Sequence, residues 1–436
     1  MNRQILRLAI PNIITNITVP LLGMVDTAVV GHMQGNEVCS QTDYLSAIAL
    51  GSMIFNLVYW LFGFLRMGTS GFTAQAYGAR NLKEAMSILI RSGTLALFIA
   101  IILIVFQYPI GWISMQMAGS SSTIKSLALE YFHIRIWAAP ATLGMYAIKG
   151  WFIGMQNSKT PMFIAIFINI MNIAFSILLV FSFGMKIQGV AWGTVIAQYS
   201  GLFVSGILWW KYYRRMRKYV EWKHTLQSGW KIFFGVNGNI FLRTLCLVTV
   251  TTFFTAASSH MPDPTLAVNT LLMQLFTLFS YISDGFAYAG EALSGKFIGA
   301  KNHNSLRKTI YYLFRWGFGI SLVFTLLYWV AGDFILNFLT NSTVVLKASR
   351  EFTPWILLIP LTGFAAFLWD GIYIGATSSG PIRNTMFVAT GLFFVVYFLT
   401  PAWGNHGLWS AFIIYLLSRG IGLWLLSEKH IYRLAK

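Results

Sequence analysis

Long apolar stretches recur along almost the whole chain, and they constrain its fold more than any other feature. A helix needs roughly 20 mostly apolar residues to cross a bilayer. Twelve such stretches can be traced, at residues 6–32, 44–77, 87–110, 126–155, 160–183, 187–211, 228–258, 265–299, 309–331, 347–376, 382–403 and 406–427. Because backbone groups in lipid must be satisfied internally, we expect an all-α membrane protein with twelve transmembrane helices.

The composition excludes a water-soluble domain. Hydrophobic residues make up 56% of the 436 residues, charged residues make up 10%, and the mean hydropathy is +0.65. The first apolar stretch follows Arg3 and Arg7, as in a signal peptide, but it is longer and contains Pro11, Pro20 and Asp26. We interpret it as a retained first helix.

The net charge of +18 belongs largely to one side of the membrane. With a cytoplasmic N-terminus, the other side receives only Lys125, Lys186, Lys347 and Arg350, while the cytoplasmic side receives 21 basic residues: Arg3, Arg7, Arg80, Lys83, Arg91, Lys159, Lys211, Arg214, Arg215, Arg217, Lys218, Lys223, Lys231, Lys296, Lys301, Arg307, Lys308, Arg383, Lys429, Arg433 and Lys436. This bias predicts that both termini are cytoplasmic. The basic run 211–223 indicates topology and contact with anionic lipid, and we expect no nucleic-acid partner.

An internal repeat organises the chain. When the sequence is shifted by 221 residues, Gly78–Asn81 aligns with Gly299–Asn302, and Gly150–Gly154 aligns with Gly371–Gly375. Two halves of six helices each enter the membrane from the same side, so the repeats are parallel. We expect an N-lobe at 1–212, a cytoplasmic linker at 213–227 and a C-lobe at 228–436, with a substrate bound between rocking lobes.

Ionisable residues at membrane depth are costly and therefore informative. Asp26 lies in Gly23–Gly31 after Pro20, with no obvious cation one turn away in its own helix. Burial disfavours an ionised carboxyl, so Asp26 is a candidate for proton or cation coupling. The alternative is a neutral, hydrogen-bonded Asp26 that only supports helix packing.

The second half carries charges of both signs. Asp284 and Glu291 lie seven residues apart on one helical face, Asp370 lies in the tenth stretch and Arg243 lies in the seventh. One interpretation is a structural ion-pair network, such as Arg243 with Asp370 or Glu291. The other is a coupling network whose pairing changes when a carboxyl is protonated. Arg66, Arg135, Lys149, Arg315 and Arg419 are further basic residues within apolar stretches.

Amides and a tyrosine in the fifth and sixth stretches form a third group of candidates. Asn169, Asn172, Gln198 and Tyr199 either join neighbouring helices by hydrogen bonds or line a cavity. In the second interpretation, Asn172 supplies an oxygen to the cavity of Asp26, and the others belong with Arg243 to a substrate or gating network. Cys39 and Cys246 belong to no metal or disulfide motif, so no metal and no cofactor is expected.

Several motifs together resemble the multidrug and toxic compound extrusion (MATE) family. They are Pro11-Asn12, Met24–Gly31, Gly71–Gly78, Ser283–Leu293 and Asp370–Thr377, and the last two are similar to its DNA-damage-inducible F branch. The resemblance implies a V-shaped pair of lobes that exports organic, often cationic and amphipathic compounds in exchange for H⁺ or Na⁺. It also implies a multi-pass protein of the plasma (bacterial inner) membrane without an obligate protein partner.

The same resemblance implies roles for individual residues. Asp26 matches the acidic residue of the family's first helix, Asp370 matches an acidic position of the tenth helix, and Glu291 is similar to a carboxylate of the second lobe. Asn172 matches the asparagine of an Asn-x-x-x-Asp pattern, but here the fourth residue on is Ser176. Because sodium prefers several oxygen ligands whereas a proton needs only Asp26, proton coupling is favoured over sodium.

Other function classes fit less well. A flippase for lipids or lipid-linked saccharides, from the same superfamily, has this architecture but needs cations for phosphate, and Arg66, Lys149 and Arg243 keep it open. An enzyme needs a clustered reactive constellation, whereas the seven histidines are dispersed. An ATP-driven pump needs a Walker A motif, which the sequence lacks. We therefore expect a secondary antiporter that is not an enzyme.

Overall fold

The computed structural model describes residues 1–32, 40–117, 119–222, 225 and 229–435, and within them the regular secondary structure is all helical. Cys39, Lys223, Lys436 and part of the predicted linker 213–227 lie outside the described residues. The chain divides into two compact units. Unit 1 comprises Met1–Ile13, Ala74–Arg80 and Lys231–Lys436, and unit 2 comprises Ile14–Thr73 and Asn81–Trp230.

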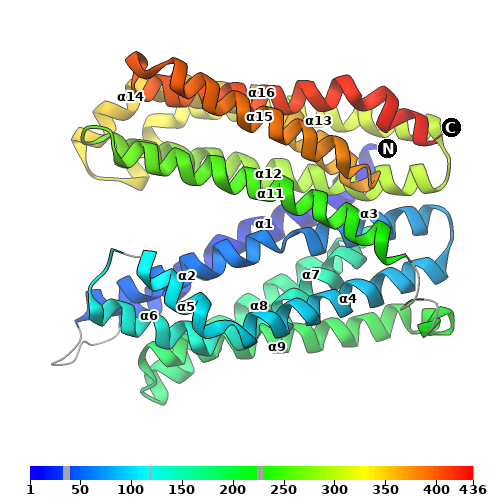
Figure 1. Cartoon of the computed structure of the whole chain (residues 1–436), viewed down its shortest axis with the longest axis horizontal. Coiled ribbons are helices and arrows are strands. Elements are labelled where there is room, and N and C mark those ends of the chain that lie inside the picture. Colours follow the sequence, from blue (N-terminus) through cyan, green and yellow to red (C-terminus); the bar gives the residue numbers. More distant parts are fainter. Residues whose placement is uncertain (33–39, 118, 223–224, 226–228, 436) are drawn as a thin grey trace. The chain divides into compact units, whose positions relative to one another are not determined.

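Unit 2 is a bundle in which α9 is the central neighbour. This helix packs against α6, α7 and α8, while α4 packs against α7 and α2 against α6 (Figure 1). The helices are α1 (Asn2–Gly31, shared with unit 1), α2 (Gln41–Leu61), α3 (Phe64–Gly78, also shared), α4 (Leu82–Val105), α5 (Gln107–Met117), α6 (Ser122–Arg135), α7 (Ala139–Gly154), α8 (Lys159–Ile177) and α9 (Lys186–Tyr213).

Unit 1 is arranged around α14, which packs against α12, α13 and α16 (Figure 1). Its long helices are α11 (Trp230–Ser259), α12 (Thr265–Gly299), α13 (His303–Leu339), α14 (Thr343–Gly375), α15 (Ser379–Leu399) and α16 (Asn405–His430). The core is rich in buried aromatic rings such as Phe254, Phe279 and Trp409, but large apolar side chains such as Trp329 and Phe338 also lie exposed. Apolar residues both in the core and on the outer surface are expected for a helix bundle that is surrounded by lipid.

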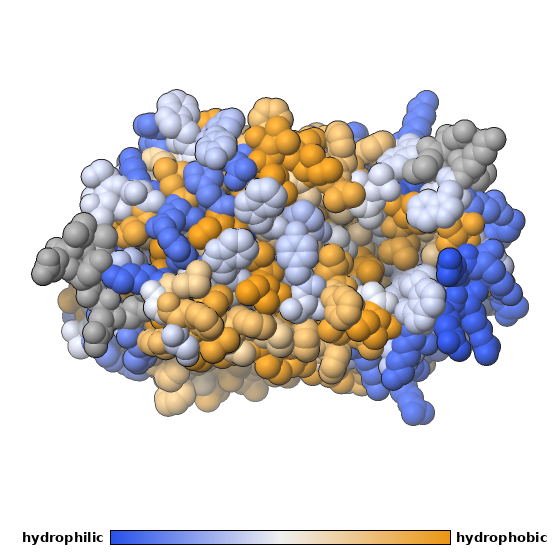
Figure 2. Space-filling view, turned by 90° about the horizontal axis from the view of Figure 1, so that it is seen from below, coloured by the Kyte–Doolittle hydropathy of each residue, from blue (hydrophilic) through white to orange (hydrophobic). Residues whose placement is uncertain are grey.

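Eleven helical segments in the described part of the chain are long and apolar enough to cross a membrane. Figure 2 shows one face of the molecule, on which apolar side chains fill the middle and hydrophilic ones gather at both ends. The predicted fourth crossing, 126–155, is not one continuous helix, because α6 and α7 are separated by the 3₁₀ turn Ile136–Ala138. Pro140 has no backbone N–H, so inside a continuous helix it would remove a hydrogen bond. At the start of α7, where it lies, that N–H would have no partner within the helix, so its loss is tolerated.

Local structure recurs at the same 221-residue shift that aligns the sequence with itself. Two residues after their helices end, Arg80 and Lys301 have φ of 55° and 51°, and Gln156 and Thr377 have φ of 63° and 51°. The side chains of Asn81 and Asn302 then cap the next helices by accepting from Glu84 and Ser305 backbone N–H groups, at 3.0 and 2.9 Å.

Glycines make the close helix crossings in equivalent places. A Cβ at Gly150 would overlap the carbonyl of Arg66, and a Cβ at Gly371 would overlap that of Ala287. The same holds for Gly78 against Lys296 and, reciprocally, for Gly299 against Gln75, all within unit 1. Glycine lets two backbones approach to this distance because it has no side chain.

Candidate functional site

Asp26 is buried in α1 without an ionic partner. Its side chain is 3% exposed, its Oδ1 accepts no hydrogen bond, and no ion pair to it is found in the described part of the chain. The Asn172 side chain of α8 lies beside the carboxyl, and Arg135 of α6 adds a favourable electrostatic interaction. The structure thus brings together Asp26 and Asn172, as in one of the two interpretations of the sequence, and Asn172 also joins two helices, as in the other.

Asn172 links α8 to α9. It donates from Nδ2 to Oγ1 of Thr194 at 2.9 Å, and Thr194 donates to the carbonyl of Val190 at 3.1 Å. The Oδ1 of Asn172 and the Oγ of buried Ser176, one turn along α8, accept no hydrogen bond. The close approach of the two helices depends on Gly193, whose missing Cβ leaves room for Ser176.

Thr194 was missed by the sequence analysis. It is 3% exposed and fixes the amide of Asn172, so that the amide oxygen is left available. Its signal in the sequence is weak, because a threonine in an apolar helix usually bonds to its own backbone, as Thr194 also does. Only the pairing with Asn172, 22 positions earlier, reveals its second contact.

Arg135 forms its hydrogen bonds with neutral groups rather than with the Asp26 carboxylate. It donates to the hydroxyl of Tyr131 and to Oγ of Ser52, the latter at 3.2 Å, and its guanidinium lies 5.0 Å from the ring centre of Phe55. These neutral partners satisfy the cation without neutralising it. Arg135 therefore influences Asp26 through its field rather than through a salt bridge.

The chemistry of this cluster is that of a cation acceptor. Asp26 Oδ1, Asn172 Oδ1 and Ser176 Oγ are buried oxygens with no hydrogen-bond donor. Burying an unpaired carboxylate is costly, and protonation or a bound cation removes that cost. A protonated Asp26 would also gain an O–H donor for the neighbouring amide oxygen.

The charged residues of unit 1 form a different kind of cluster. Asp370 of α14 accepts from Arg243 of α11 and from Arg419 of α16, the latter at 2.5 Å, and all three side chains are buried. Asp284 of α12 adds a favourable electrostatic interaction with Arg419. Of the partners considered for Arg243, the structure selects Asp370.

Glu291 lies on α12 where that helix crosses α14. It is 1% exposed, and its backbone carbonyl lies against Gly375 of α14. At the 221-residue shift its counterpart is Ser70, whose carbonyl lies against Gly154 in the same manner. The backbone at position 291 therefore takes part in a helix crossing that both halves of the chain share.

The remaining candidates are dispersed in unit 2. Asn169 donates to the backbone carbonyl of Thr18 at 2.9 Å, which joins α8 to α1. Tyr199 is 42% exposed and donates to the carbonyl of Trp137 at 3.0 Å. Gln198 is half-buried in α9. In unit 1, by contrast, Arg315 of α13, one of the basic residues within the apolar stretches, is exposed.

Comparison with known proteins identifies the family. A family model described as MatE matches residues 11–178 and 240–399. The chain belongs to the MATE family. It is 34% identical to DNA damage-inducible protein F of Escherichia coli (strain K12) over 98% of this chain and 92% of that protein. It is 22% identical to a probable multidrug resistance protein NorM of Thermotoga maritima, over 88% and 80% of the two chains.

Solved MATE structures have the same fold. A MATE protein in the straight conformation superposes with a TM-score of 0.85 at 18% identity, covering 99% of this chain and 96% of that one. An outward-facing multidrug resistance MATE transporter gives a TM-score of 0.82 at 20% identity with the same coverage. MATE proteins are membrane transporters, so the expected class, a multi-pass transporter related to the DNA-damage-inducible F branch, is confirmed.

Proposed function

We propose that this MATE protein is a secondary antiporter that exports organic, often cationic and amphipathic compounds in exchange for H⁺. It would cross the bacterial inner membrane twelve times, with both termini in the cytoplasm, and alternate between its two lobes. One observation carries the proposal: Asp26 is buried without an ion pair in the described part of the chain, beside amide and hydroxyl oxygens that have no donor.

Exchange follows from competition for one carboxylate. The ionised Asp26 attracts a cationic substrate because it has no salt-bridge partner among the described residues for the substrate to displace. Protonation neutralises the carboxyl and supplies a hydrogen bond to Asn172 Oδ1, so the substrate loses its counter-ion. Proton and substrate therefore exclude each other, and a proton gradient can drive export.

Sodium coupling is the less favoured form of the same mechanism. Asp26, Asn172, Ser176 and Thr194 offer oxygen atoms, and sodium prefers several oxygen ligands. Ser176 is uncharged, so Asp26 would be the only anionic ligand among these four. A proton requires no second carboxylate.

Efflux from vesicles tests the proposal. Vesicles containing the wild type or Asp26→Asn are loaded with a fluorescent organic cation under an imposed H⁺ or Na⁺ gradient. Efflux that follows the H⁺ gradient in the wild type and disappears in Asp26→Asn supports the proposal. The control Asp333→Asn removes an exposed carboxyl of α13 and should retain efflux. Efflux that follows only the Na⁺ gradient would show that Na⁺, and not H⁺, is the coupling ion.

Lipid flipping is the second candidate because unit 2 contains two half-buried cations near each other. Lys149 of α7 lies close enough to Arg66 of α3 for the two charges to act on each other. Two neighbouring cations suit a phosphate better than a cationic drug. Absence of cation efflux under either gradient, together with flipping of a fluorescent phospholipid that Lys149→Gln abolishes, would favour the flippase.

A further inference from the structure

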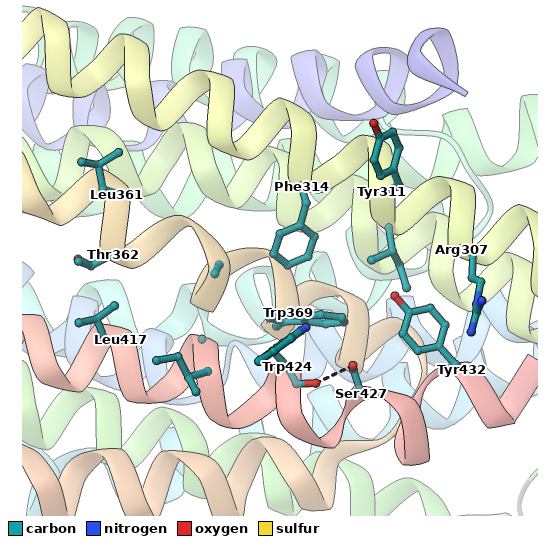
Figure 3. A pocket seen from close by; sticks show the side chains of 14 residues that line it. Arg307, Tyr311, Phe314, Leu361, Thr362, Trp369, Leu417, Trp424, Ser427 and Tyr432 are labelled. Atoms are coloured by element: carbon teal, nitrogen blue, oxygen red, sulfur yellow. Dashed lines mark hydrogen bonds between the residues drawn. The ribbon is translucent and has the colours of Figure 1, made fainter.

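Unit 1 has a surface groove that is lined by residues between Arg307 and Tyr432. It has a volume of about 650 Å³ and lies between α13, α14, α16 and the C-terminal turn Tyr432–Ala435. Figure 3 shows Arg307 and Tyr432 at one end, Phe314, Trp369 and Trp424 in the middle, and Leu361 and Leu417 at the other end. The groove thus has a charged end, and apolar side chains make up most of the rest of its lining, with Thr362 and Ser427 among them.

The polar end offers a cation to a ligand. The Arg307 guanidinium lies 5.3 Å from the ring centre of Tyr432, which holds it at the mouth of the groove, and its side chain is 58% exposed. Its carboxylate partner, Glu428, is 3.9 Å away and equally exposed. An exposed ion pair of this length contributes little, so Arg307 can bind an anion instead.

The apolar part has the length of one lipid leaflet. Leu417 and Ser427, both lining the groove, are ten residues apart on α16, which corresponds to about 15 Å at 1.5 Å per residue. That is half of the roughly 30 Å hydrocarbon core. The flanking side chains of Tyr311, Ile421 and Trp424 are 51–64% exposed, as side chains open to lipid would be.

Basic residues near the Arg307 end of the groove favour a ligand with a negative charge. The same end of unit 1 carries basic residues at the ends of α12, α13 and α16, namely Lys296, Lys301, Lys308, Lys429 and Arg433. Basic residues next to a membrane attract anionic lipid headgroups. An apolar channel of one-leaflet length that ends in this field matches a lipid with a negative phosphate.

We propose that this groove is a binding site for an anionic phospholipid of the leaflet on the basic side, with the phosphate at Arg307 and one acyl chain between Phe314, Trp369 and Trp424. The ring centres of Phe314 and Trp369 are 5.0 Å apart, so the two rings form a continuous apolar wall for the chain. The site does not depend on the transport mechanism proposed above.

Native mass spectrometry of the full chain in detergent tests the site. The protein is mixed with equal amounts of dioleoylphosphatidylglycerol and dioleoylphosphatidylcholine, and the first bound lipid is identified. We expect phosphatidylglycerol to be preferred several-fold, and Arg307→Gln to abolish the preference while Arg307→Lys retains it. Lys347→Gln, the same charge change on an exposed lysine near the start of α14, outside the groove and its basic mouth, should retain the preference.

A second variant locates the acyl chain. Ile421→Trp places a larger ring in the groove at a position that is already 51% exposed, so the fold should be unaffected and occupancy by both lipids should fall several-fold. Size-exclusion chromatography checks that each variant is monodisperse. Equal binding of the two lipids, unchanged preference in Arg307→Gln, or unchanged occupancy in Ile421→Trp would overturn the proposal.

Discussion

Asp26 and Asp370 are both buried carboxyls in long apolar helices, yet their neighbours differ in charge. Asp370 accepts from two arginines on two other helices, so its negative charge is fully compensated. Asp26 has an amide beside it and a cation that acts only through its field. A compensated carboxylate holds helices together, whereas an uncompensated one can exchange its proton, so burial alone does not identify a coupling residue.

The largest expected effect is on stability, in Asp370→Asn. Removing the carboxylate leaves Arg243 and Arg419 facing each other without their shared anion. Breaking a buried ion pair by removing one partner costs about 3–5 kcal/mol of unfolding free energy. Denaturant unfolding in detergent measures the loss. Unchanged stability with lost efflux would mean that Asp370 is a coupling residue rather than a structural one.

Asp26→Asn should show the opposite pattern. Efflux driven by a proton gradient should fall at least about tenfold, or about 1.4 kcal/mol in activation free energy, because the amide cannot be protonated. Unfolding free energy should change by less than about 0.5 kcal/mol, since no ion pair is lost. Vesicle efflux and detergent unfolding are measured on the same preparation. A loss of unfolding free energy similar to that of Asp370→Asn would show that Asp26, like Asp370, stabilises the fold.

Asn172→Ala should have an intermediate effect on efflux. It removes the amide oxygen proposed to accept a hydrogen bond from protonated Asp26, and it removes the hydrogen bond to Thr194. One hydrogen bond is worth about 0.5–1.5 kcal/mol, or roughly 2- to 12-fold in rate. Ser176→Ala is the matched control on the next turn of α8. Its Oγ accepts no hydrogen bond, so proton-driven efflux should be retained. A larger effect of Ser176→Ala would indicate a bound cation with several oxygen ligands.

The smallest effect is expected for an exposed carboxyl. Asp333 pairs with Arg350 at 3.1 Å, but the two side chains are 62% and 66% exposed. Asp333→Asn should therefore cost less than about 1 kcal/mol of unfolding free energy and leave efflux unchanged. The same unfolding and efflux assays apply. A cost comparable to that of Asp370→Asn would show that geometry rather than burial sets the strength of these pairs.

Much of the fold could be predicted from the sequence because lipid imposes a simple rule on helix length. The apolar stretches locate the long helices, with ends that differ by up to eight residues, as at α13. The repeat predicts where helices end, as near Arg80 and Lys301. The interruption near Pro140 was not predicted, because apolar character continues through it while the backbone hydrogen bonding does not.

The candidate site could be predicted only in part. Asp26 and Asn172 stand out because polar groups are rare at membrane depth, and one of the two interpretations of the sequence placed them in the same cavity. Arg419 was noted but not paired, and Thr194 was missed, because their partners are 49 and 22 positions away. Gln198 and Tyr199 look equally promising in the sequence, but nothing there distinguishes an exposed helix face from a buried one when both faces are apolar.

The sequence by itself determined that this protein lies in lipid, that it is helical, that it contains an internal repeat and that it resembles one family. These properties depend on composition and on patterns that are local or repeated along the chain. Only the tertiary structure decided which charges meet. Asp26, Glu291 and Asp370 are similar carboxyls in the sequence, and the difference between a compensated and an uncompensated one depends on arginines from other helices. Electrostatic energy depends on distances in space, and helix packing sets those distances.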